Sequence, residues 1–431
     1  MNVLNEKLVA FFASYDFDVS APEIDGATKA LFYDMKVGLE NELAPFTQEM
    51  LPTWIQVKKP RDKRVIVLDA GGTNFRSFLV EIKNGKAKIL KSKKGLLPAV
   101  ESELTKDEFF EKIAENIEYL KDEAPEINFC FAYALQMTPD KDAKVLRMSK
   151  EIKVKGILNE LVGESLFEVL KKKGWKKLTK ISVINDTAAA LLSGLSLGKE
   201  YSSYIGMILG TGFNIAYIES EPIKKLKENE QLLNQIVVCE TAKTNRVVGS
   251  CFDIELRKQT IDGELCKLEK ICAGAYLGDL ISICFRHACK DKIFTKNFAS
   301  AFEKKNFSFQ TINEFLTGEN LEDNEIITLI KKISASNEDL YLFKNIAVNV
   351  LERVARVASA ALIAVALKTK QGRNASSPIC IVAEGTTFKK AFGLKKNVEK
   401  FLTEHLTKKY GVHFELHEIE NAIALGAAYF S

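Results

Sequence analysis

The segment "VIVLDAGGTNFRSFLVEI" (residues 65–82) places a carboxylate and bare backbone amides at one turn. The first apolar run predicts a buried strand that ends at Asp69, and a second apolar run follows the turn. Two successive glycines, Gly71 and Gly72, can adopt positive φ and let the backbone approach a ligand closely. Their amides and the Thr73 hydroxyl could then donate hydrogen bonds to phosphate oxygens. The alternative interpretation is an ordinary tight hairpin with a surface aspartate.

The same turn carries residues suited to a magnesium-bound phosphate. Asp69 could hold Mg²⁺ directly or through water, because Mg²⁺ binds carboxylates, waters and phosphates together. Asn74 and Arg76 follow the turn, and Arg76 could reach a phosphate. The Walker motif GxxxxGK[ST] does not occur in the sequence, which argues against a P-loop NTPase.

A second candidate carboxylate lies in "VINDTAAALL", where a predicted strand meets a predicted helix. Phosphoryl transfer to a hydroxyl requires a carboxylate that orients the nucleophile and accepts its proton. Asp186 could serve as this general base, with Asn185 as a neutral hydrogen-bonding neighbour. The alternative is that Asp186 is only the N-cap of the helix.

The strand–turn–strand pattern occurs a second time in "YIGMILGTGFNIAYIES", from Tyr204 to Ser220, with Gly210, Thr211 and Gly212 at the turn and Asn214 after it. The later segment "SPICIVAEGTTFKKAF" adds a buried strand that ends at Gly385 and Thr386. A duplicated unit of this kind predicts two similar lobes across a cleft, with two hairpins that grip a triphosphate from opposite sides.

The elements that must position these residues alternate along the chain. Alternating strands and helices predict an α/β protein with a mixed sheet, and 431 residues exceed what one core serves. A capping box from Thr105 to Glu108 predicts one helix, and "GILNELVGESLFEVLKKKG" (residues 156–174) predicts another. The Ala-rich run from Val357 to Leu367 is too short to span a bilayer and predicts a buried helix.

The bulk composition is that of an ordinary globular protein. Hydrophobic residues make up 46% and charged residues 27%, and 61 basic against 57 acidic side chains leave a net charge of +4. This balance gives no indication of nucleic-acid binding, and no secretory signal or membrane span is evident. The eight cysteines lack zinc spacing, and several lie in apolar runs. We therefore expect a soluble, cytoplasmic protein, a monomer or homodimer, that binds neither nucleic acid nor membrane.

The sequence also resembles the hexokinase family, which belongs to the actin/Hsp70-type ATPase superfamily. The resemblance runs from about residue 58 to the C-terminus. It is carried by "LDAGGTNFR", "FCFAYALQMTPDKDAKVLRMSK", "VINDT", "IGMILGTGFNIAYIE", "VVCETA", "LEKICAGAYLGDL", "VAEGTTFKK" and "LGAAYF". It implies a duplicated actin-like ATPase (ribonuclease H-like) fold with two lobes around a central cleft.

The expected organisation has four parts: an N-terminal helical segment on the large lobe (1–57), a small lobe (58–186), a large lobe (187–416) and a C-terminal helix that returns to the small lobe (417–431).

The resemblance implies an ATP-dependent hexokinase that phosphorylates the 6-hydroxyl of glucose or a related hexose with Mg²⁺, with lobe closure on sugar binding. It makes Asp186 the catalytic base, with Lys150 as a second catalytic residue. The implied hexose ligands are Ser149, Lys150, Asn185, Asp186, Asn214, Glu240 and Glu269. The implied ATP-binding residues are Asp69, Gly71, Gly72, Thr73, Asn74, Arg76, Gly210, Thr211, Gly212, Gly385 and Thr386, and Asp69 is expected to hold Mg²⁺ through water.

Several positions depart from the family pattern. Ala132 and Ala134 replace a Ser and a Pro, Phe213 replaces a Ser or Thr, Thr241–Lys243 replace a Trp-Gly, and Ala422–Leu425 replace Gly-Ser-Gly-Lys. Three alternatives follow: a hexokinase-like sugar sensor with weak or no activity, an ATPase without a sugar acceptor, and a glucokinase of the repressor/open-reading-frame/kinase type. The zinc-binding cysteine cluster of that last type is missing from the sequence.

Overall fold

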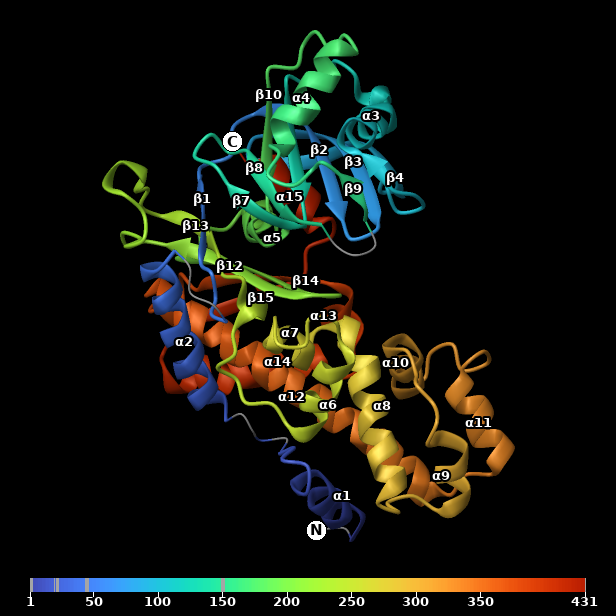
Figure 1. Cartoon of the computed structure of the whole chain (residues 1–431). Coiled ribbons are helices and arrows are strands. Elements are labelled where there is room, and N and C mark those ends of the chain that lie inside the picture. The colour runs from blue at the N-terminus through green and yellow to red at the C-terminus, as the bar shows by residue number, and fades with distance from the viewer. Residues whose placement is uncertain (1–2, 19, 21–22, 43–45, 149–151, 431) are drawn as a thin grey trace.

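The computed structural model describes residues 3–18, 20, 23–42, 46–148 and 152–430, which form two α/β lobes (Figure 1). Each lobe contains one large sheet. The small-lobe sheet has the order β10-β6-β2-β3-β4 and the large-lobe sheet the order β1-β13-β12-β11-β14-β15. A hairpin of β7 (Ala134–Met137) with β8 (Ala143–Arg147) and a short pair of β5 (Leu104–Thr105) with β9 (Val154–Lys155) extend the small lobe.

The two sheets share one topology. In the small lobe, β2 pairs antiparallel with β3 and parallel with β6, and β6 pairs parallel with β10. In the large lobe, β11 pairs antiparallel with β12 and parallel with β14, and β14 pairs parallel with β15. The small-lobe strands are β2 (Lys63–Gly71), β3 (Asn74–Lys83), β4 (Lys86–Leu96), β6 (Glu126–Phe131) and β10 (Lys180–Ile184). The predicted duplication is therefore confirmed at the level of strand order and direction.

The large-lobe sheet carries one additional strand, β1, at its edge. β1 pairs antiparallel with β13, and the chain then continues into β2 of the small lobe. The large-lobe strands are β1 (Leu51–Gln56), β11 (Ser203–Leu209), β12 (Phe213–Glu219), β13 (Gln235–Val238), β14 (Ile379–Glu384) and β15 (Phe414–His417). β1 thus ties the residues before the small lobe to the large-lobe sheet.

Helices cover both sheets. The small lobe carries α3 (Lys106–Asn116) and α4 (Val162–Lys172). The large lobe and its extension carry α1 (Val3–Ala13), α2 (Ile24–Glu40), α6 (Cys251–Gln259), α7 (Lys267–Cys272), α8 (Gly274–Lys290), α9 (Lys296–Phe302), α10 (Phe309–Thr317), α11 (Glu325–Ile333), α12 (Asn337–Thr369), α13 (Thr386–Lys390) and α14 (Leu394–Phe401), with a π-helix over Leu402–Lys409. α1 and α2 both contact α12, which places the N-terminal helices on the large lobe.

Two short helices lie between the sheets. α5 (Asp186–Ser193) packs on β11, and α15 (Ala422–Tyr429) packs on β2 and on α5 (Figure 1). Glycine permits both close contacts: a Cβ on Gly206 would lie 2.2 Å from the Thr187 carbonyl oxygen, and one on Gly426 would lie 1.7 Å from that of Ala189. α5 is therefore held from two sides by backbone contacts, with Asp186 at its first position.

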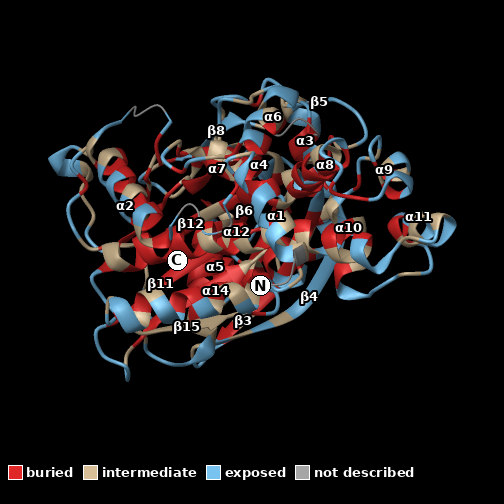
Figure 2. Cartoon of the chain, turned by 90° about the horizontal axis from the view of Figure 1, so that it is seen from below, coloured by how far each residue is buried: buried red, intermediate tan, exposed pale blue. Residues whose placement is uncertain are grey.

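The apolar core follows these layers. Figure 2 shows buried residues concentrated around α5 and α12, with exposed residues at the periphery. The Ala-rich run from Val357 to Leu367 lies within α12 and is almost entirely buried, as predicted. All eight cysteines are free, and Cys130, Cys272, Cys284 and Cys380 are buried. Within the described residues, no helix combines the length and apolar character needed to cross a membrane.

The predicted helix over residues 156–174 is wrong at its N-terminal end. The capping box at Thr105 is present and begins α3, but α4 begins only at Val162. The preceding residues pair with the β8 strand instead, since the Asn159 amide donates to the Val145 carbonyl at 2.8 Å. The Asp142 carboxylate accepts hydrogen bonds from the Gly163 amide at 2.7 Å, so a distant side chain caps the helix.

The expected segment boundaries stay predictions. The boundary after residue 186 falls at the first residue of α5, and the one after residue 416 falls inside β15.

Candidate active site

The first of the two turns predicted to bind phosphate joins β2 to β3 in the small lobe. The strands pair up to Gly71 and Asn74, which leaves Gly72 and Thr73 as a two-residue turn. Gly72 has φ of +56°, a conformation that costs a side chain free energy, whereas Gly71 does not have positive φ. The Tyr133 hydroxyl donates to the Gly72 carbonyl at 2.6 Å and thereby holds the turn in place. Gly72, Thr73 and Asn74 are all exposed.

Asp69 and Arg76 face each other across this hairpin. The Arg76 Nε donates to Asp69 Oδ2 at 2.8 Å, and its Nη2 contacts the same oxygen. Oδ1 of Asp69 has no hydrogen-bond donor among the described residues. Burial raises the pKa of Asp69, and the Arg76 guanidinium opposes that rise only in part. Arg76, which we expected to reach a phosphate, is therefore engaged with Asp69 in this structure.

Asp186 begins α5, and the helix N-cap is its neighbour. The Asn185 Oδ1 accepts the Thr187 amide at 2.9 Å, which makes Asn185 the cap and corrects the alternative in which Asp186 serves as the cap. The Asn185 side-chain NH₂ group has no acceptor among the described residues. Asp186 Oδ1 also accepts the Thr187 amide, at 2.8 Å.

The protein surrounds Asp186 on nearly all sides, although the residue keeps a partly exposed surface toward the cleft. Burial raises the pKa of Asp186 to about 6, and the negative charges of Asp69 and Glu240 add to the rise. The carboxylates of the small lobe, α5 and the large lobe are thus close enough to influence one another. A base with this pKa is poised for proton transfer near neutral pH.

The second turn predicted to bind phosphate joins β11 to β12 in the large lobe. The Gly210 amide donates to the Gly212 carbonyl at 2.9 Å, and Thr211 is exposed at the tip. The Gly210 carbonyl accepts the Gly274 amide at 2.8 Å and the Thr387 hydroxyl at 2.9 Å. These contacts fix the turn against the starts of α8 and α13.

The late glycine segment reaches the same turn. A Cβ on Gly210 would lie 3.5 Å from the Gly385 Cα, and Gly385 itself has φ of +111°. Thr386 is exposed at the start of α13. The structure therefore brings the predicted ATP-binding residues of the large lobe together at one place.

Three of the predicted sugar ligands gather beside this turn. The Asn214 Nδ2 donates to Glu240 Oε1 at 2.8 Å, and Glu240 has φ of +55°, a strained conformation for a side-chain-bearing residue. Glu269, on α7, lies against the same turn, because a Cβ on Gly212 would be 2.8 Å from its Oε1. Burial raises the pKa of Glu269, and the Phe213 backbone amide lowers it by donating to the carboxylate. Ser149 and Lys150 lie outside the described residues.

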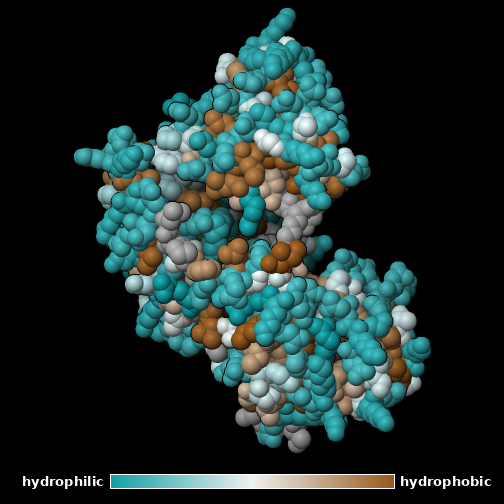
Figure 3. All heavy atoms as spheres, in the orientation of Figure 1, coloured by the Kyte–Doolittle hydropathy of each residue, from teal (hydrophilic) through white to brown (hydrophobic). Residues whose placement is uncertain are grey.

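Figure 3 shows a hollow between the two lobes. Three further residues surround the predicted ligands and were not found by sequence reasoning. They are Tyr133, Arg147 and Lys243. Tyr133 supports the Gly72 turn, and Arg147, the last residue of β8, lowers the pKa of Glu269 through its positive charge. The Lys243 ammonium lies 3.6 Å from Glu240 Oε2. Arg147 and Lys243 were detectable only as basic residues close in sequence to predicted ligands.

The departures from the family pattern fall at different depths. Phe213 is buried in the large-lobe core, so its side chain does not occupy the cleft. Ile423 is partly buried against the apolar cluster between the two sheets. Its side chain offers no hydroxyl at this place, where the family pattern has Gly-Ser-Gly-Lys. Ala132 is partly exposed, and its amide donates to the Ala70 carbonyl at 3.0 Å.

The donor set suits a magnesium ion held mainly by a nucleotide. The described residues contain no group of three His, Cys, Asp or Glu side chains that could hold a metal ion by themselves. Asp69 keeps one carboxylate oxygen without a protein donor, which fits a single contact made directly or through water. The remaining ligands would be phosphates and waters.

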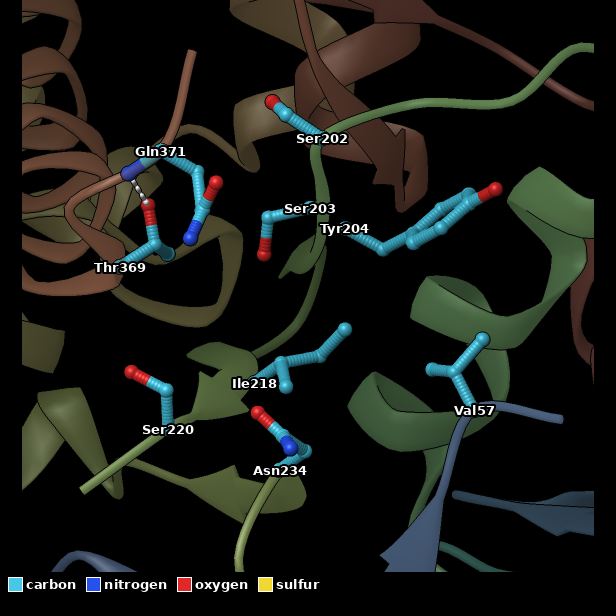
Figure 4. Close-up of a pocket in the computed structure, with 9 residues that line it drawn as sticks. All are labelled: Val57, Ser202, Ser203, Tyr204, Ile218, Ser220, Asn234, Thr369 and Gln371. Carbon is cyan, nitrogen blue, oxygen red and sulfur yellow. Dashed lines mark hydrogen bonds between the residues drawn. The ribbon is translucent and has the colours of Figure 1, made fainter. Parts of the chain in front are cut away.

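A separate cavity of about 250 Å³ lies away from this cleft (Figure 4). It is lined by Ser203 and Ile218 of the β11–β12 hairpin, at the end opposite the Gly210 turn, and by Val57, which follows β1. Thr369, the last residue of α12, and Gln371, which follows the helix, close another side, where the Gln371 amide donates to the Thr369 hydroxyl. None of the predicted site residues lines this cavity.

Comparison with known families agrees with the geometry. Two family models described as hexokinase match the chain, one over residues 13–195 and the other over residues 204–431. The chain belongs to the hexokinase family.

The similar proteins are hexokinases of moderate to low identity. Hexokinase-1 of Schizosaccharomyces pombe is 31% identical over 251 residues, which covers 54% of this chain and 51% of that protein. Hexokinase-2 of Equus caballus is 24% identical over 395 residues and covers 82% of this chain and 41% of that protein. The chain thus spans about half or less of the length of these curated relatives. The hexokinase-like 1 protein of Arabidopsis thaliana is 23% identical, and the match covers 96% of this chain and 88% of that protein.

Solved structures show the same fold. A hexokinase from Schistosoma mansoni complexed with glucose superposes with a TM-score of 0.79 at 21% identity, covering 99% of this chain and 98% of that one. A second hexokinase crystal structure gives 0.75 at 19% identity, covering 100% of this chain and 99% of that one. The two lobes are therefore the duplicated actin-like ATPase fold that the sequence predicted.

Proposed function

We propose that this chain is an ATP-dependent hexokinase that transfers the γ-phosphate of Mg-ATP to the 6-hydroxyl of glucose or a related hexose. The observation that carries the proposal is Asp186. Its carboxylate stands at the start of α5, where burial and the charges of Asp69 in the small lobe and Glu240 in the large lobe raise its pKa to about 6.

Asp186 would act as the general base. It would accept the proton of the 6-hydroxyl while that oxygen forms a bond to the γ-phosphorus and the bond from the γ-phosphorus to the bridging oxygen of ADP breaks. The Asn185 amide would orient the hydroxyl, because its oxygen is engaged with Thr187 while its NH₂ group remains able to donate. Mg²⁺, when bound with ATP, would neutralise the phosphate charge.

The remaining polar residues would recognise the hexose ring. Asn214, Glu240 and Glu269 form one cluster beside the Gly210 turn, and Ser149 and Lys150 would complete it from the small lobe. A site built from such groups rejects analogues that lack the matching hydroxyls, because its own polar groups would remain unpaired. Exposed amides and hydroxyls at Gly72, Thr73 and Thr211 would hold the triphosphate from the two lobes.

The proposal is tested by ADP release from Mg-ATP with glucose, mannose, fructose and no sugar. We expect sugar-dependent ADP, matched by an equal amount of hexose 6-phosphate. The Asp186→Ala variant should lose roughly 10²–10⁴-fold in kcat, as expected for a general base. Near-normal turnover by this variant, with circular dichroism showing it folded, would contradict the assignment of the base.

The second candidate function is a sugar sensor that binds hexose without transferring phosphate. The observation that favours it is the loss of polar residues around Ile423, which leaves an apolar surface where the family pattern has Gly-Ser-Gly-Lys. Glucose that raises the melting temperature while no ADP forms under any condition would support the sensor over the kinase.

A further inference from the structure

Lys243 places a cation beside a predicted sugar-binding carboxylate. The residue ends the short 3₁₀ turn Thr241–Lys243, which directly follows Glu240. Its ammonium lies 2.6 Å from Glu49 Oε1 and 3.6 Å from Glu240 Oε2. The side chain is one-quarter exposed, and its ammonium lies between the two carboxylates. Lys243 therefore belongs to the edge of the sugar site.

Both oxygens of Glu240 already have partners. Oε1 accepts the Asn214 amide, and Oε2 faces the Lys243 ammonium. The neighbouring carboxylate, Glu269, also has cations close to it: burial raises its pKa, and the positive charges of Lys270 and, to a smaller extent, Arg147 counteract part of that rise. The negative charge of the two predicted sugar ligands is thus partly balanced before any sugar binds.

We propose that Lys243 shifts the selectivity of the sugar site toward neutral hexoses and away from protonated amino sugars. The inference rests on the proposed hexokinase function and concerns the substrate class of the same site. Glu49 acts against this effect, because its carboxylate neutralises part of the Lys243 charge.

The physical reason is the difference between a hydroxyl and an ammonium group. A hydroxyl donates one hydrogen bond to Glu240 and gains or loses little from a nearby charge. An ammonium bound to the same carboxylate would lie within about 7 Å of Lys243, where like charges repel appreciably in a partly buried site. This repulsion opposes the attraction of Glu240 and Glu49 for the ammonium, and it weakens binding of the charged sugar roughly tenfold relative to a site without Lys243.

The test compares kcat/KM for glucose, 2-deoxyglucose and glucosamine at pH 6.5, where the amine is protonated. 2-Deoxyglucose is the neutral control, because it also lacks the 2-hydroxyl but carries no charge. We expect Lys243→Met to raise the ratio of glucosamine to glucose about tenfold and to leave the 2-deoxyglucose ratio nearly unchanged. Lys243→Arg, which keeps the charge, should retain the wild-type ratio.

Glu49→Gln separates an electrostatic role from a structural one. Both Lys243→Met and Glu49→Gln break the same ion pair, so a purely structural role would move the glucosamine ratio in the same direction in both variants. The proposal requires opposite directions: the ratio rises in Lys243→Met and falls in Glu49→Gln. Changes in the same direction, or no change in Lys243→Met, would overturn it.

The pH dependence gives an independent readout. An amine of this kind titrates at about 7.7–8.0, near an α-amino group. The glucosamine-to-glucose ratios of the wild type and Lys243→Met should therefore differ about tenfold at pH 6.5 and converge at pH 9, where the amine is neutral. A difference between the two proteins that persists unchanged at pH 9 contradicts the inference. Absence of glucose phosphorylation by the wild type would instead contradict the proposed function itself.

Discussion

Asp186 is held in an environment that disfavours its charge. The protein surrounds the carboxylate, Asp69 and Glu240 add negative potential, and the described donors to its side chain are only the backbone amides of Thr187 and of Asp186 itself. A pKa near 6 in the folded protein, against 3.8 ordinarily, means that the ionised form costs the folded state free energy. Such a cost is typical of a residue retained for function rather than for stability.

Asp186→Asn should consequently be inactive but more stable than the wild type at pH 7.5. The gain is at most about 2–3 kcal/mol, from a pKa difference of about two units. The folded carboxyl binds a proton more tightly than the unfolded one, so the wild type regains stability as pH falls from about 6 toward 4. Urea unfolding at pH 7.5 and pH 4 measures this. An equal gain at both pH values would contradict an electrostatic origin of the strain.

The same carboxyl predicts the acid limb of the reaction. Because a protonated Asp186 cannot accept the hydroxyl proton, kcat/KM for glucose should fall about tenfold for each pH unit below 6. Initial rates between pH 4.5 and 8 measure the limb, after a check that the protein remains folded. An acid limb whose midpoint lies below pH 4.5 would indicate a carboxyl with an ordinary pKa.

At the scale of elements, the position of α5 decides where Asp186 stands. β11 supports the helix on one side and α15 on the other, through contacts at Gly206 and Gly426. These elements come from the middle and the end of the chain, and both must be in place before the base is positioned. The identity of two glycines behind α5 thus controls the geometry of the site.

Gly426→Ala should destabilise the protein by at least about 1–3 kcal/mol, as overpacking does, because the added Cβ meets the Ala189 carbonyl. It should also lower kcat by displacing α5. Gly95→Ala is the matched control, since a Cβ there meets nothing within 4 Å. Thermal unfolding and steady-state rates measure both effects. A Gly426→Ala variant indistinguishable from Gly95→Ala would refute this account of α5.

At the scale of the whole molecule, the predicted site is divided between two lobes. Asp69 and the Gly72 turn belong to the small lobe, whereas Asn214, Glu240 and Glu269 belong to the large lobe. The chain passes between the two sheets in the segments from β1 to β2, from β10 through α5 to β11, and from β15 to α15. A ligand that contacts both lobes would favour the arrangement in which they approach each other, and closure would exclude water from the phosphate.

Saturating glucose should therefore decrease the radius of gyration in small-angle X-ray scattering. Glu269→Ala, which removes a predicted sugar ligand of the large lobe, should need a higher glucose concentration for the same decrease. Asp186→Asn should still contract, because the amide can hydrogen-bond to the sugar. An unchanged radius of gyration, at glucose concentrations that saturate binding, would contradict closure.

The motifs, their order and the two-lobed fold could all be predicted from the sequence. The reason is that Gly72 and Gly210 sit in local strand–turn–strand patterns, which short-range chemistry defines. Local signals also predicted the capping box of α3 and the buried run in α12.

Which side chains meet, by contrast, depends on the tertiary structure. In the folded protein Asn185 is the N-cap of α5, and Arg76 pairs with Asp69. α4 begins only at Val162, where the Asp142 carboxylate caps it. The fold also places Lys243 between Glu49 and Glu240. Two of these contacts, Asp142 with Gly163 and Lys243 with Glu49, join segments that are separated along the chain and form only when each lobe is folded. The charge of a residue can be read from the sequence, but its distance to another charge is set by the whole fold.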